Sequence, residues 1–224
     1  MSIFSTYWEG RKIDKGCCMP WLPTRVIKEP PDVEQRLEEL ELSRPKLLRV
    51  RDIAFAEAGN ATPNHCVNAA GVFSYQHGTW ALRDQFVGQL WRPDRLNGVE
   101  SIKNSVTDIR VVYQNIDKAL DDEYQPRPRS AKGGGSEKLC QPNLFGTALP
   151  HYRKGDAQPQ LVYYLMVDES GACELSCPIV KDSVFTEFVE RIYLSDGADF
   201  GGQKLPLDEE DAVSDFDPIV ARKA

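Results

Sequence analysis

Four cations lie close together in the middle of the chain, in a stretch rich in proline and glycine: Arg127, Arg129, Lys132 and Lys138. In proteins that bind single-stranded nucleic acid, such cations contact the phosphates while exposed aromatic rings stack on the bases. The predicted strands on either side of this stretch carry three tyrosines, namely Tyr113, Tyr163 and Tyr164. We therefore expect these residues together to form a binding surface for a single strand.

Other groups of reactive side chains give weaker indications of a metal site or a catalytic site. His65, Cys66 and His77 lack the spacing of about two to five residues that paired zinc ligands use. Asp168 and Glu174 flank a predicted turn, which leaves a metal-dependent nuclease as an alternative, although the turn itself explains Asp168. We predict no metal site, no cofactor and no catalytic residue.

The chain is acidic, and much of the excess acid lies close to its end. Its 224 residues hold 27 Lys and Arg against 34 Asp and Glu, which gives a net charge of −7. The segment 205–224 contains a cluster of acids around one aromatic residue: Asp208, Glu209, Glu210, Asp211, Asp215, Phe216 and Asp217. This composition predicts a mobile tail, because the segment has too little apolar surface to offset the entropy lost on ordering.

The tail resembles the acidic C-termini of bacterial and phage single-stranded-DNA-binding proteins, although it ends in the basic sequence 221–224. The resemblance implies a segment that recruits a protein partner and competes with DNA for a basic groove. Proteins that coat nucleic acid are usually basic, however. The alternative is an acidic protein-interaction module, such as an inhibitor or an assembly subunit, whose surface engages a basic partner or imitates nucleic acid.

The first 31 residues predict an irregular arm, because prolines and aromatic residues occur there without periodicity. Trp8 and Trp21 are candidates for docking to a partner, which includes a second copy in a homodimer. The six cysteines lack the spacings of a disulfide framework. The sequence shows neither a secretory signal nor an apolar run of membrane-spanning length, so we expect a cytoplasmic protein without membrane contact.

Hydrophobic periodicity predicts the main elements of the body. Helices are expected over 32–40, over 80–91 and from residue 182 onward. A strand is expected over 108–116, and a β-hairpin joins 161–167 to 173–179, with Pro178 at a sheet edge. The segment 46–56 fits either a strand or a helix.

These elements predict an α+β fold with a mainly antiparallel sheet and packed helices. We expect three parts: the arm 1–31, a single domain 32–204 with a long loop at 121–145, and the acidic tail 205–224. The favoured function is that of a non-enzymatic, cytosolic accessory protein that binds single-stranded DNA. Its protein partner would contact the two tryptophans of the arm and the acids of the tail.

Overall fold

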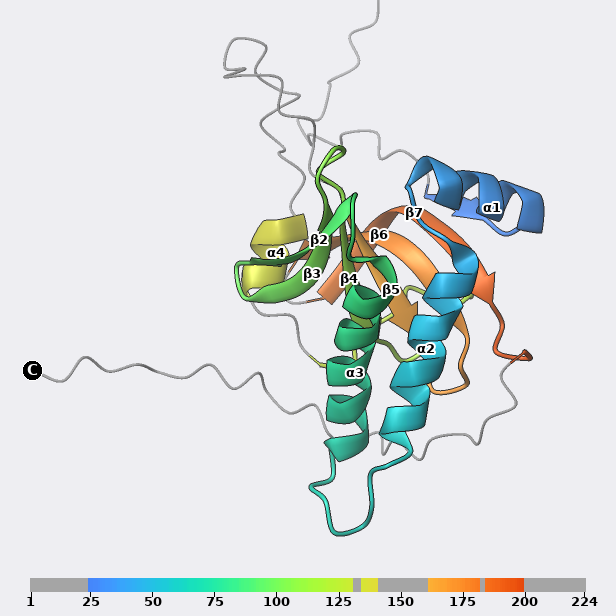
Figure 1. Ribbon diagram of the computed structural model, residues 1–224. Helices are drawn as coiled ribbons and strands as arrows, with labels where there is room; N and C mark the ends of the chain where they lie inside the picture. Colours follow the sequence, from blue (N-terminus) through green and yellow to red (C-terminus); the bar gives the residue numbers. More distant parts are fainter. Residues whose placement is uncertain (1–23, 131–133, 141–160, 182–183, 200–224) are drawn as a thin grey trace, which may run out of the picture.

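The chain forms, in a computed structural model, a seven-stranded sheet with helices packed against it (Figure 1). The structure describes residues 24–130, 134–140, 161–181 and 184–199. The strand order is β1-β7-β6-β5-β4-β3-β2, so β1 and β2 are the two edge strands. The strands are β1 (Arg25–Ile27), β2 (Trp91–Leu96), β3 (Val99–Asn104), β4 (Arg110–Asn115), β5 (Val162–Val167), β6 (Cys173–Lys181) and β7 (Val184–Ser195).

The sheet is mixed, which agrees in part with the prediction. β4 pairs with β5 in parallel, and β1 pairs with β7 in parallel. The remaining neighbours are antiparallel. The α+β class is therefore confirmed, whereas the parallel pairings at β1 and β5 were not expected.

Helices cover both faces of the sheet. On one face, α1 (Pro30–Glu39), α2 (Arg44–Ala58) and α3 (Ala69–Phe86) share a hydrophobic core with the strands. On the other face, α4 (Gly134–Cys140) contributes Leu139 and Cys140 to a second core. Figure 1 shows α2 and α3 side by side and α1 beside β7. Successive strand residues point to opposite faces of the sheet. Because helices cover both faces, both sets of side chains in the central strands are buried.

The clearest prediction, the hairpin of β5 and β6, is confirmed. Val167 lies opposite Cys173, and Gly171 has a φ of 83°, a left-handed conformation that glycine adopts at little steric cost. β6 is not an edge strand, because it lies between β5 and β7, but its pairing with β5 covers only Cys173 to Ser176, so Pro178, near its end, pairs with Phe188 of β7 alone. The β6–β7 pairing shifts register beside Pro178, and such a bulge accommodates a residue that has no N–H to donate.

The helix predicted from residue 182 onward is wrong, because this segment forms β7. Phe185 and Phe188 are three residues apart, as on one face of a helix, and both pack in the core on the α4 side. A regular strand would place them on opposite faces. The pairing with β6 skips Thr186, and this extra residue puts both phenylalanines on the same face.

The helix predicted over 80–91 matches only the second half of α3. Leu82 and Phe86 are buried, as expected. Trp91 and Pro93 belong instead to β2, which pairs with β3 alone. Proline fits an edge strand, where the outward N–H groups have no ladder partner. The ambiguous segment 46–56 is helical and lies within α2.

Two elements lie inside segments for which no regular structure was expected. β1 falls within the predicted arm 1–31, and α4 within the predicted loop 121–145. The described cysteines form no disulfide with one another: Cys66, Cys140, Cys173 and Cys177. Among the described residues, none of the helices has the length and apolar character needed to cross a membrane.

Candidate functional site

The three tyrosines proposed to stack on bases lie in the protein core. Tyr113, Tyr163 and Tyr164 are each at most 2% exposed. The Tyr113 hydroxyl bonds to Ser74, and the Tyr164 hydroxyl contacts the Cys140 thiol. The expectation of exposed rings is therefore wrong, because helices cover the faces of the sheet from which these rings project.

The cations of the predicted loop are not gathered into a free basic surface in the part of the chain that the structure describes. Arg127 is exposed, and its guanidinium lies over the Tyr124 ring. Arg129 is committed to an ion pair with Glu169 (2.7 Å) and to a hydrogen bond with the Ile116 carbonyl. Lys132 and the side chain of Lys138 lie outside the described residues.

The two carboxylates weighed for a nuclease are used to hold the fold together. Glu174 accepts hydrogen bonds from Arg191, Ser176 and the Leu120 amide. Asp168 accepts bonds from the amides that follow it in the turn and from the Ala119 amide. In the described ranges no three His, Cys, Asp or Glu side chains lie where they would share a metal ion.

The residues predicted to bind a protein partner lie outside the described ranges. They are Trp8, Trp21, Asp208, Glu209, Glu210, Asp211, Asp215, Phe216 and Asp217. Their role in partner binding stays a prediction.

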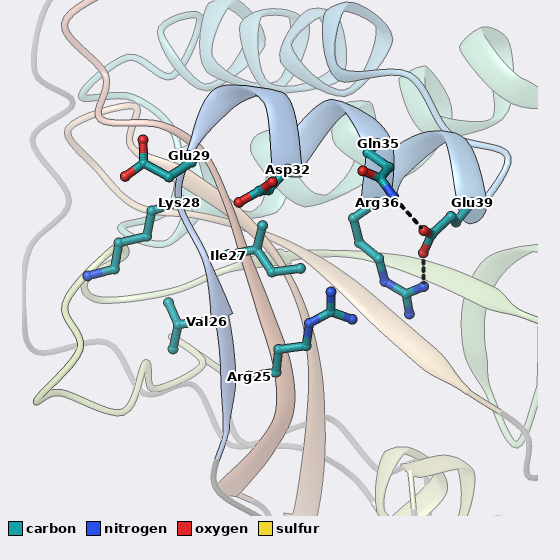
Figure 2. Close-up of a pocket in the computed structure, with 9 residues that line it drawn as sticks. All are labelled: Arg25, Val26, Ile27, Lys28, Glu29, Asp32, Gln35, Arg36 and Glu39. Carbon is teal, nitrogen blue, oxygen red and sulfur yellow. Dashed lines mark hydrogen bonds and ion pairs between the residues drawn. The ribbon is translucent and has the colours of Figure 1, made fainter.

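A pocket of about 450 Å³ lies between β1 and α1 at the edge of the sheet (Figure 2). Its β1 side is lined by four consecutive residues, 25–28, and its α1 side by Asp32, Gln35, Arg36 and Glu39. The α1 side of the lining lies over the face that β1 shares with β7 (Figure 2), because Arg36 reaches Glu190 of β7. Among the described residues β1 pairs with β7 alone.

An ionic network joins the pocket residues Arg36 and Glu39 to the buried Glu190. The Arg36 Nε lies 3.1 Å from both carboxylate oxygens of Glu190, and Nη1 donates to Glu39 at 2.7 Å. The Tyr163 hydroxyl donates to Glu190 at 2.8 Å. Burial and the neighbouring Glu190 charge raise the pKa of Tyr163 above its usual value. Burial alone would lower the pKa of Arg36, but its bonds to Glu39 and Glu190 raise it, so the guanidinium stays charged.

The cations that line the pocket are all paired with carboxylates. Arg25 lies 3.2 Å from Glu190, and Lys28 pairs with Asp122 at the start of the neighbouring loop. Within the described residues, in contrast, the Glu29 and Asp32 side chains have neither a hydrogen bond nor an ion pair. The pocket therefore has two carboxylates without a cationic side chain among the described residues, both at the N-terminus of α1, where the helix dipole stabilises acids.

The outer face of α1 adds further negative charge around the pocket. Val33 and Leu37 turn inward and are buried. Glu34, Glu38 and Glu41 are exposed. A solvated carboxylate raises the local concentration of cations, and these three acids lie outside the pocket lining, with Glu41 just beyond the end of α1.

Sequence reasoning placed the helix but missed this pocket. The apolar spacing of 32–40 predicted α1, and the acids around it are plain in the sequence. The pocket also needs β1, a three-residue strand whose partner among the described residues, β7, lies more than a hundred residues later in the chain. No local sequence pattern predicts such a pairing.

Comparisons of the chain with protein-family models, with curated proteins and with solved structures found no match.

Proposed function

We propose that the protein is an acidic interaction module, of the inhibitor or assembly-subunit class, that binds a basic segment of a partner protein at the pocket between β1 and α1. The observation that carries this proposal is the charge balance of the pocket. Arg25, Lys28 and Arg36 are paired with carboxylates, while Glu29 and Asp32 have no partner among the described residues. A cationic side chain would complete the network.

Single-strand binding is the competing function, and the structure removes half of its basis. Stacking requires exposed aromatic rings, and the three sheet tyrosines are buried. Phosphates would also be repelled by the carboxylates of α1 at short range. The basic-partner function needs neither exposed tyrosines nor a basic groove.

Fluorescence anisotropy with two labelled probes tests the proposal at near-physiological salt. One probe is a peptide of alternating arginine and threonine, and the other is a single-stranded oligonucleotide. We expect the peptide to bind and the oligonucleotide not to bind. Replacing Glu29→Lys together with Asp32→Lys should weaken peptide binding about tenfold or more, because two attractive charges become repulsive.

The matched control changes net charge equally at a distance from the pocket. Glu57→Lys with Asp84→Lys alters two acids on α2 and α3, and we expect peptide affinity to fall by less than about threefold through long-range charge alone. If both double variants lost the same peptide affinity, the binding would be explained by non-specific charge attraction. If the oligonucleotide bound and the peptide did not, binding of single-stranded nucleic acid would be the favoured function.

A further inference from the structure

We propose that a row of three cations across β2, β3 and β4 binds a single phosphate group. The cations are Arg92 on β2, Lys103 on β3 and Arg110 on β4. These strands follow one another at the side of the sheet that ends in β2, whereas the pocket lies at β1, the other edge strand (Figure 1). The row is therefore separate from the site of the proposed function and does not rest on it.

The first step of the argument is the pairing register. Arg92 lies directly opposite Lys103, and Lys103 lies directly opposite Arg110. Residues opposite one another in antiparallel strands project from the same face, with Cβ atoms about 4.5–5.5 Å apart, and like charges at such positions destabilise the sheet. Three cations in register therefore form an arrangement that an anion would stabilise.

The second step is the charge balance of the row. Asp94 accepts a hydrogen bond from the Arg110 Nε at 2.7 Å, and Asp108 lies 2.7 Å from the Lys103 Nζ. The bond from Lys103 lowers the pKa of Asp108, so this carboxylate is ionised and occupied. Arg92 is exposed and has neither an ion pair nor a hydrogen bond among the described residues. Two carboxylates thus accompany three cations, and one positive charge is left uncompensated.

The third step is a buried donor on Arg110. The side chain is 5% exposed, and its Nη1 atom is buried without a hydrogen-bond partner among the described residues. The guanidinium reaches across β3, because Asp94 of β2 accepts bonds both from it and from Ser101 of β3. Arg92 is two residues from Asp94 and projects from the same face. Buried donors almost always have a partner in the protein, a water molecule or an ion, and an oxyanion bound at Arg92 and Lys103 would bring an acceptor to this guanidinium.

A phosphate group fits the row better than other anions. Arginine and lysine donate charge-assisted hydrogen bonds to phosphate oxygens, and a phosphate group carries about 1.5 to 2 negative charges at neutral pH, whereas a carboxylate carries one. A nucleic-acid strand needs several cations that neutralise successive phosphates, but this row has one uncompensated positive charge. Arg92 is exposed and the Lys103 side chain is 30% exposed, so the ligand reaches the row from solvent.

NMR titration of the full-length protein with inorganic phosphate, at constant ionic strength, tests the proposal. The Nε–H signals of the arginine side chains report on each guanidinium group. We expect the signals of Arg92 and Arg110 to shift in a saturable manner and the signal of Arg95 to stay unchanged. Arg95 belongs to the same strand as Arg92 but projects from the opposite face, where it pairs with Glu100.

Two variants with the same change of net charge measure the contribution of the row. Arg92→Gln removes the uncompensated cation and should weaken phosphate binding about fivefold or more. Arg95→Gln should change it by less than about twofold, because salt screens charges that do not contact the ligand. Both side chains are exposed, so neither substitution disturbs the core.

Equal weakening in both variants would overturn the proposal, because the binding would then be non-specific charge attraction. A saturable shift of Arg92 without a shift of Arg110 would also contradict it, since the buried donor would then take no part in the site. If acetate bound as tightly as phosphate, the ligand would be a carboxylate and the assignment to phosphate would be wrong. Absence of any saturable shift would mean that the row binds no phosphate, and the proposed function would be unaffected.

Discussion

The Arg191–Glu174 pair shows how one residue holds a loop against the sheet. The two side chains are 4% and 0% exposed and are joined by bonds of 2.7 and 3.0 Å, while Arg191 also donates to the Asp121 carbonyl. Replacing Arg191→Met leaves a buried, uncompensated carboxylate, and we expect the free energy of unfolding to fall by about 3–5 kcal/mol in urea titrations.

The control for this prediction is a more exposed ion pair. Arg129 and Glu169 are 24% and 46% exposed, so Arg129→Met should cost only about 0–1 kcal/mol. If the two variants lost the same stability, burial would not be the cause of the Arg191 effect.

Asp199 makes the stability of the fold depend on acid pH. Its hydrogen bond to Arg51 lowers the pKa of this carboxyl from 3.8 to about 2. Because the pKa is depressed in the folded state, the contribution is fully present above pH 4 and is lost as pH falls toward 2. Asp199→Asn should therefore lower stability at neutral pH and flatten the loss between these values in urea titrations. An equal loss of stability between pH 4 and pH 2 in Asp199→Asn and in the unchanged protein would contradict this prediction.

At the scale of the element, α3 offers two glycines with opposite expected effects. A Cβ at Gly78 would lie 2.6 Å from the Tyr113 ring, whereas a Cβ at Gly71 would meet nothing within 4 Å. Gly78→Ala should therefore destabilise the protein by about 1–3 kcal/mol through overpacking. Gly71→Ala should stabilise it by about 0.5–1 kcal/mol through helix propensity. Thermal unfolding of both variants measures the difference, and shifts of the same sign would contradict the close packing of α3 on β4.

The elements that sequence predicted best are those defined by local contacts. The β5–β6 hairpin and α1 follow from adjacent residues, and both are present. β7 was misread because the bulge at Thr186 gives a strand the apolar spacing of a helix. The β2–β3 hairpin was missed although Asn97 and Gly98, both at positive φ, form the commonest two-residue turn signal.

Less of the candidate site than of the fold could be predicted from the sequence. Successive strand residues point to opposite faces, so Tyr163 and Tyr164 could not share the single surface that was predicted, and alternation does not tell whether a second layer covers a face. Here helices cover both, so both rings are buried. The pocket depends on the parallel pairing of β1 with β7, and contacts between segments so distant in the chain carry no sequence period.

At the scale of the whole molecule, charged and apolar surface come from different segments. Three acids, Glu29, Asp32 and Glu39, line the β1 pocket. Most of the exposed large apolar side chains of the described residues belong instead to α3 and the segments before and after it: Val67, Val72, Tyr75, Trp80, Val87, Leu90 and Val106. Exposed apolar side chains mark an interaction site when they form one contiguous surface.

Two valines of nearly equal exposure test whether this apolar surface is contiguous. Val87 is 41% exposed at the end of α3, two helical turns beyond Trp80, and Val184 is 44% exposed at the start of β7. Retention on a hydrophobic-interaction column depends on clustered apolar area, so Val87→Gln should shorten retention more than Val184→Gln. Both substitutions are at the surface and should change unfolding free energy by no more than about 0.5 kcal/mol. Equal retention shifts would mean that the exposed side chains act singly, and the partner would then be held by the acidic side of the molecule alone.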